Sequence, residues 1–75
     1  MTDDEIKAIR FVWKSHTSME HEHCTVYLST CGRFGMCVHV PYKYGRPYGR
    51  TYTHYRIGGK VFNTEIAFRN ALRQI

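Results

Sequence analysis

The spacing of apolar residues near the end of the chain predicts an amphipathic helix. A spacing of i, i+3, i+4 and i+7 relates the apolar residues Phe68, Ala71, Leu72 and Ile75. Asn63 or Thr64 can cap this helix, and Phe62 lies where a hydrophobic staple is expected. The C-terminal segment is therefore expected to form a helix that covers a sheet with one face.

The central part of the chain alternates apolar and polar residues with the period of β-strands. We expect strands over 24–30, 34–42 and 51–57, and a short strand or helix run-in at 60–62. Gly32 and the pair Gly58-Gly59 supply the turns. The side chains expected to face the core are Cys24, Val26, Leu28, Met36, Val38 and Val40. Those expected on the other face are Tyr27, Cys37, His39 and some of Tyr52 and His54.

The N-terminal segment fits two structures. Thr2 and Glu5 have the spacing of a capping box, which favours a helix over 3–10. Residues 11–15 continue this helix or begin a strand, because apolar and basic residues alternate there. Residues 15–23 are polar and lack a period, which is typical of a linker or a frayed strand start.

Together these elements predict a single small α+β domain over 1–75. It is an antiparallel meander of three or four strands, with a C-terminal helix packed on one face and an N-terminal helix or strand. The contacts expected in its core join Met36 and Val38 to Phe68, Leu72 and Ile75. A chain of 75 residues can bury only one small core.

The segment 59–67 resembles the last strand and the helix start of DNA-binding domains built from a three-stranded sheet and a helix. Such domains occur in plant transcription factors and in the arms of phage integrases. The similarity covers about ten residues and includes Gly59, Phe62 and Ala67. The resemblance implies a sheet backed by a C-terminal helix, and it assigns no family.

Charge is distributed unevenly along the chain. The formal net charge is +5, and five of the six carboxylates lie within residues 1–22. No Asp or Glu occurs between His23 and Thr64, where six Lys and Arg residues lie. Such a continuous stretch of positive charge favours a polyanion or an acidic protein surface as the partner.

The stretch 42–56 contains five of the six tyrosines and four of the basic residues. Its glycines and Pro47 favour a loop. Interleaved Tyr and Arg can stack on bases and neutralise phosphates, although the same residues are common at protein interfaces. The residues expected to bind nucleic acid or a protein partner are Lys43, Tyr44, Arg46, Tyr48, Arg50, Tyr52 and Arg56.

We therefore expect a basic module that binds nucleic acid. The alternative is a small modulator, of the kind found in phages and mobile elements, that binds and inhibits a larger protein or nucleoprotein complex.

Histidines and cysteines raise a further alternative, a structural zinc module. The chain has no Cys-x-x-Cys and no closely spaced histidine pair of the usual kind. The residues that could meet across strands are His21, His23, Cys37 and His39. From the spacing we expect no cofactor and no metal requirement for folding.

Other function classes are disfavoured. The carboxylates lie mostly at the N-terminus, no phosphate-binding glycine loop is present, and the core is too small to enclose a substrate site. We therefore expect no enzyme activity and no small-molecule substrate. The acidic first residues differ from a signal peptide, and three cysteines fit a reducing compartment, so we expect a cytoplasmic protein without membrane contact.

Overall fold

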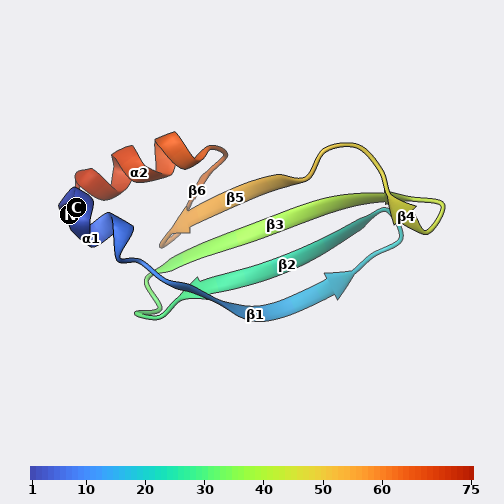
Figure 1. Ribbon diagram of the computed structural model, residues 1–75, viewed down its shortest axis with the longest axis horizontal. Helices are drawn as coiled ribbons and strands as arrows, with labels where there is room; N and C mark the ends of the chain where they lie inside the picture. Colours follow the sequence, from blue (N-terminus) through green and yellow to red (C-terminus); the bar gives the residue numbers. More distant parts are fainter.

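The computed structural model describes residues 1–75 as an α+β fold (Figure 1). The elements in chain order are α1 (Asp3–Lys7), β1 (Phe11–Ser18), β2 (Glu22–Ser29), β3 (Phe34–Lys43), β4 (Arg46–Pro47), β5 (Tyr52–Ile57), β6 (Lys60–Phe62) and α2 (Glu65–Arg73). The sheet order is β1-β2-β3-β5-β6, every pairing is antiparallel, and β4 pairs with β3 beside this path. The predicted α+β meander with a C-terminal helix is confirmed. Neither helix is long and apolar enough to cross a membrane.

The N-terminal segment divides into a short helix and a strand. Thr2 and Glu5 form the capping box: the Glu5 amide donates to Thr2 Oγ1 at 3.2 Å, and the Thr2 amide donates to Glu5 Oε1 at 2.9 Å. The helix ends at Lys7, before residue 10, because Phe11 and the residues after it pair with β2. The segment 15–23, expected to be a linker or a frayed strand start, holds the end of β1, a short connection and the start of β2.

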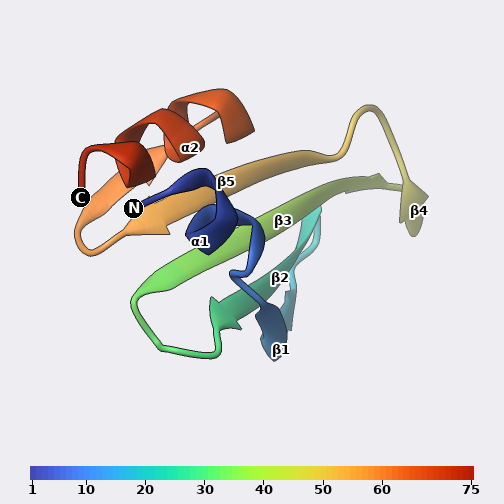
Figure 2. The same cartoon turned by 60° about the vertical axis from the view of Figure 1, so that its left-hand side comes forward.

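The two helices cover only one end of one sheet face (Figures 1 and 2). The buried core consists of Ile6, Phe34, Phe68 and Leu72. Half-buried apolar residues that pack around it are Met1, Ile9, Phe11, Tyr55, Ile57 and Phe62. We call this part of the molecule the helical end, and both chain ends lie there. The molecule measures 44 × 21 × 21 Å, so the sheet continues well beyond its core.

The expected core face of β2 is wrong. Leu28 pairs with Gly35 and Val26 pairs with Cys37, so Cys24, Val26 and Leu28 lie on the face opposite to the helices. Tyr27, expected on that other face, pairs with Met36 on the helical face. The connection between Ser29 and Phe34 sets a register one residue away from the expected one, and a shift by one residue exchanges the faces of a strand.

The expected contacts of α2 are right only in part. Phe68 and Leu72 are buried, and Thr64 caps the helix by accepting a hydrogen bond from the Ala67 amide. On β3, however, both residues pack against Phe34, because α2 lies over the end of the sheet where β3 begins. Met36 and Val38 follow Phe34 on the same face but lie outside the core cluster, and Ile75 is exposed.

Candidate functional site

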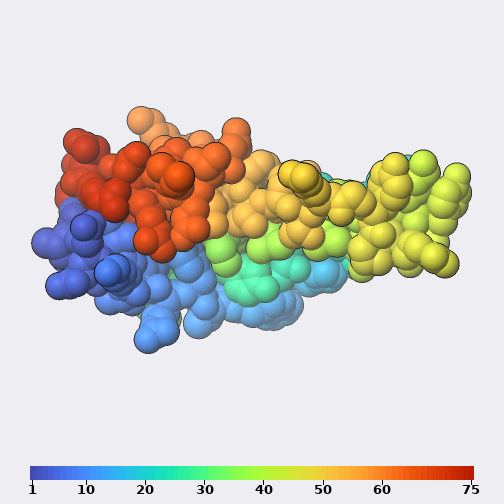
Figure 3. All heavy atoms as spheres, turned by 45° about the horizontal axis from the view of Figure 1, so that its top comes forward, coloured from blue at the N-terminus to red at the C-terminus, as the bar shows by residue number.

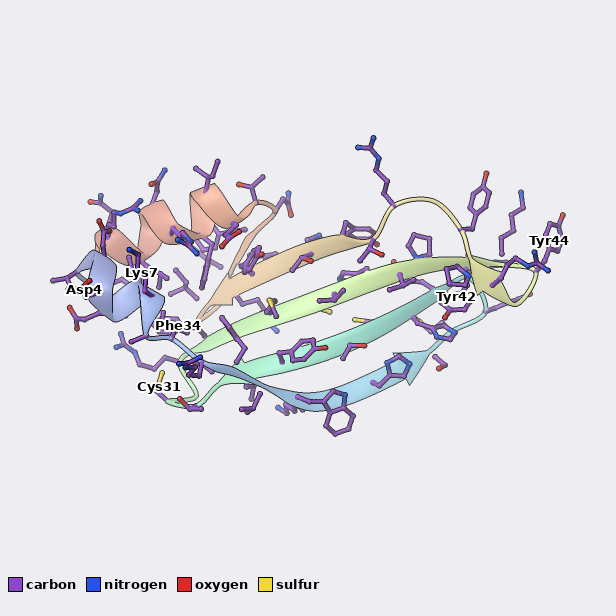
Figure 4. All side chains as sticks on the ribbon, viewed as in Figure 1. Asp4, Lys7, Cys31, Phe34, Tyr42 and Tyr44 are labelled. Atoms are coloured by element: carbon purple, nitrogen blue, oxygen red, sulfur yellow. The ribbon has the colours of Figure 1, made fainter.

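The end of the molecule opposite to the helices is a tight hairpin. Lys43 pairs with Arg46, which leaves Tyr44 and Gly45 as a two-residue turn. Both turn residues have positive φ, 54° at Tyr44 and 74° at Gly45, as the I′ class of hairpin turn requires. Because this turn keeps β3 and β4 paired up to its last residue, Tyr44 lies at the outermost point of the sheet (Figure 4). We call residues 43–50 the tip.

The tip combines exposed aromatic rings with unpaired cations. The Tyr44 side chain is 91% exposed and that of Tyr48 is 60% exposed. Lys43 Nζ lies 5.5 Å from the centroid of the Tyr44 ring and 5.0 Å from that of Tyr48. Arg46 and Arg50 are exposed, and neither they nor Lys43 form an ion pair with a carboxylate. Their charges are therefore available to a ligand.

Beyond Pro47 the chain returns to the sheet through a short loop. The Tyr48 amide donates to the Pro41 carbonyl at 2.8 Å, and Gly49 with φ of 80° bends the chain. Figure 3 shows the tip as a narrow extension of the molecular body. A shallow groove of about 590 Å³ lies against it, lined by Glu20, His21, Pro41, Tyr42, Lys43, Tyr44, Gly45 and Tyr48.

Two of the seven predicted binding residues lie away from the tip. Tyr52 opens β5, where its ring stacks on His39 with centroids 4.6 Å apart and its hydroxyl donates to Glu22. That hydrogen bond raises the pKa of Tyr52 and lowers the pKa of Glu22. Arg56 pairs with Gly35 near the helical end. The structure therefore gathers Lys43, Tyr44, Arg46, Tyr48 and Arg50 and separates Tyr52 and Arg56 from them.

A second group of polar side chains lies on the face opposite to the helices, which we call the open face. Its ligand-type atoms belong to Cys24, Cys37 and His39, and these lie within 4.8 Å of one another. We call these three residues the thiol–imidazole cluster. Burial raises the pKa of Cys37 to about 12, and the nearby Cys24 contributes in the same direction.

The surroundings of His39 leave its imidazole without a hydrogen bond. Glu22 Oε2 lies 3.3 Å from Nδ1, within ion-pair distance, and neither of the two buried ring nitrogens forms a hydrogen bond. The rings of Tyr52 and His54 cover it, stacked and edge-on respectively, with centroid distances of 4.6 and 4.8 Å. Unpartnered buried polar atoms are uncommon in folded proteins.

The histidines predicted to join Cys37 and His39 do not do so. His23 lies on the helical face of the sheet, where its ring stacks on Tyr42 at a centroid distance of 3.7 Å. His21 lies in the exposed connection between β1 and β2. Cys24 takes their place, and it was not predicted because the expected register of β2 was wrong by one residue. The number of residues between Ser29 and Phe34 is the signal that could have revealed Cys24. An even number places Cys24 on the same face as Cys37 and His39.

The comparisons with known proteins give no parallel for either group of residues. No protein family, no curated protein and no solved structure matches this chain.

Proposed function

We propose that this chain is a small, non-enzymatic module that binds nucleic acid through its tip. The observation that carries the proposal is the exposure of Tyr44 and Tyr48 beside the unpaired Lys43, Arg46 and Arg50. Exposed rings at the end of a hairpin add little to folding. They are, however, well placed to stack on bases.

The tip suits single-stranded segments best. Aromatic faces bind any unpaired base, and each stack is worth about 1–3 kcal/mol. The cations beside the rings neutralise the phosphates that follow each base, which gives binding a strong salt dependence. A paired duplex offers its base faces only at its ends, so the two tyrosines would contribute less to duplex binding.

The groove beside the tip refines this proposal. Its lining combines Tyr42, Lys43 and Tyr48 with Glu20 and His21. The carboxylate repels phosphate, so we expect the strand to follow the basic side of the hairpin toward Arg50. The hairpin and the loop after it contain no Asp or Glu of their own, because none occurs between His23 and Thr64.

Titration of fluorescent oligonucleotides at low salt tests the proposal. We expect saturable binding of a mixed-sequence single strand, stronger than that of a matched duplex, with affinity falling steeply as salt is added. Low salt is the condition under which a basic protein binds phosphate most strongly. A flat titration there would refute the proposal. It would favour the modulator hypothesis, in which the same Tyr and Arg residues bind an acidic protein surface.

A further inference from the structure

We propose that Cys24, Cys37 and His39 bind a Zn²⁺ ion on the open face of the sheet. The site is separate from the tip, and it reverses the expectation from sequence spacing that no metal is involved. The ligands expected to meet across strands were His21, His23, Cys37 and His39, and Cys24 replaces the two histidines in the structure. The structure brings together residues from two neighbouring strands.

The sheet register creates the site. Cys24 on β2 pairs directly with His39 on β3, and Cys37 precedes His39 by two residues on the same strand. Directly paired residues and residues two apart on one strand share a face. The three ligand atoms therefore meet with separations of at most 4.8 Å. Tetrahedral zinc needs donors about 3.5–4 Å apart, given bond lengths of about 2.0–2.3 Å. Small side-chain rotations reach that spacing.

The donor types match zinc. Two sulfurs and one imidazole nitrogen are the ligands of structural zinc sites, which take a fourth donor to complete the tetrahedron. His54, which pairs with Cys37 from β5 and whose ring centroid lies 4.8 Å from that of His39, lies outside the three-residue cluster and would have to rotate to serve as the fourth donor. Glu22, at 3.3 Å from His39 Nδ1, can act as the carboxylate that orients a ligating imidazole.

The unpartnered nitrogens of His39 are the independent observation that points to a ligand. A buried donor or acceptor without a partner is costly to the fold, and a bound metal ion would give one ring nitrogen a partner. The stacked Tyr52 ring shields the imidazole from water on one side. Nε2 has no hydrogen-bond partner in the structure, and Nδ1 lies 3.3 Å from Glu22 Oε2 without forming a hydrogen bond to it.

The distribution of burial shows what the ion would contribute. All six buried residues belong to the helical end: Ile6, Ser29, Phe34, Gly35, Phe68 and Leu72. The rest of the sheet toward the tip has no buried residue. An ion bound there would join β2 to β3, and through His54 to β5. It would thereby supply a cross-link where a small fold has no core.

A disulfide between Cys24 and Cys37 is the competing use of the same sulfurs, since all three cysteines are free thiols. A disulfide would remove both sulfur donors and leave His39 unpartnered. The disulfide and the zinc site differ in the number of free thiols and in the metal bound per chain. Measuring both quantities on one preparation therefore distinguishes them.

Cobalt(II) substitution under nitrogen tests the proposal with the unmutated chain. We expect one Co²⁺ per chain, a sulfur-to-cobalt charge-transfer band, and intense visible bands typical of tetrahedral coordination. Added Zn²⁺ should displace the cobalt and abolish the colour. We expect Cys37→Ser and Cys24→Ser each to weaken metal affinity by at least about tenfold. Cys31→Ser is the matched control, because Cys31 lies in the turn at the helical end (Figure 4), and it should leave the spectrum unchanged.

Three results would overturn the proposal. One is the absence of a charge-transfer band in wild-type protein with three titratable thiols. Another is a band that survives in both Cys24→Ser and Cys37→Ser. The third is protein isolated under nitrogen with one thiol and a Cys24–Cys37 disulfide. None of these results depends on oligonucleotide binding, so the proposed function stands or falls separately.

Discussion

Arg73 Nε donates a hydrogen bond of 2.8 Å to Asp3 Oδ1, which ties the C-terminal helix to the first turn of the N-terminal helix. This contact lowers the pKa of the Asp3 carboxyl, mainly through the hydrogen bond and then through the charge of Arg73. A carboxyl whose pKa is lowered by folding stabilises the folded state above its ordinary pKa. That stabilisation is lost as the pH falls toward the lowered value.

We therefore expect Asp3→Asn to destabilise the protein at pH 7 and to reduce the further loss of stability below about pH 4. Urea unfolding followed by circular dichroism at pH 7 and pH 3 measures both effects. The control is Asp4→Asn, a neighbouring carboxylate without an ion pair. Equal behaviour of the two variants would contradict a role for the Asp3–Arg73 contact.

Leu72 is the most deeply buried side chain, with 0% exposure. Its replacement by alanine leaves a cavity between α2 and the sheet, so we expect Leu72→Ala to lower the free energy of unfolding by about 2–5 kcal/mol. Ile66→Ala is the matched control on the same helix. Ile66 is 74% exposed, so its loss should change stability by less than about 0.5 kcal/mol. An unchanged denaturation midpoint for Leu72→Ala would contradict the packing of α2.

Charge and stacking at the tip can be separated by substitution. Arg46→Ala and Arg50→Ala should each weaken oligonucleotide binding and reduce its salt dependence by about one phosphate contact. Tyr48→Ala should weaken binding with little change in the salt slope, because stacking releases no counterion. Binding isotherms at several salt concentrations distinguish the two effects. Lys60→Ala, a cation near the helical end, serves as the charge control and should have a smaller effect.

Tyr44 sits in a backbone conformation that costs a non-glycine residue roughly 1–2 kcal/mol, with φ of 54°. Asn before Gly is the preferred pair in this turn class, so Tyr44→Asn should leave stability equal or higher. The same change should weaken oligonucleotide binding, because it removes the exposed ring. Thermal unfolding and binding, measured on one preparation, report the two effects. Loss of stability together with loss of binding would indicate a structural role for the ring.

The local features of the fold could be predicted from the sequence. Caps and turns depend on neighbouring residues, so the sequence predicts the Thr2 cap, the Gly58-Gly59 hairpin and a cap at Asn63 or Thr64, of which Thr64 is the one observed. The position of the helices along the sheet could not be, because it depends on which of several apolar residues on β3 contacts Phe68. Phe34, and not Met36 or Val38, contacts Phe68, because α2 runs back from the end of β6 toward the end of the sheet where α1 lies (Figure 1).

The tip could be predicted from the sequence and the thiol–imidazole cluster could not, because only the tip depends on residues that are close in sequence. The tip residues are consecutive, and composition alone placed them together. The thiol–imidazole cluster needs Cys24 on the same face as Cys37, which depends on the length of one connection. A period of two carries no information about which face is buried when both faces are partly polar. Alternation therefore identified the strands and left their faces undetermined.

The meeting of both chain ends at the helical end determines how this protein can be attached to other molecules. The Met1 amine donates to the Leu72 carbonyl at 3.2 Å, so the first and last residues share one small area. That area lies at the opposite end of a 44 Å long molecule from the tip. A fusion partner or surface linker joined at either end leaves the tip unobstructed. Two copies linked in tandem would be joined at their helical ends, with both tips remote from the linker.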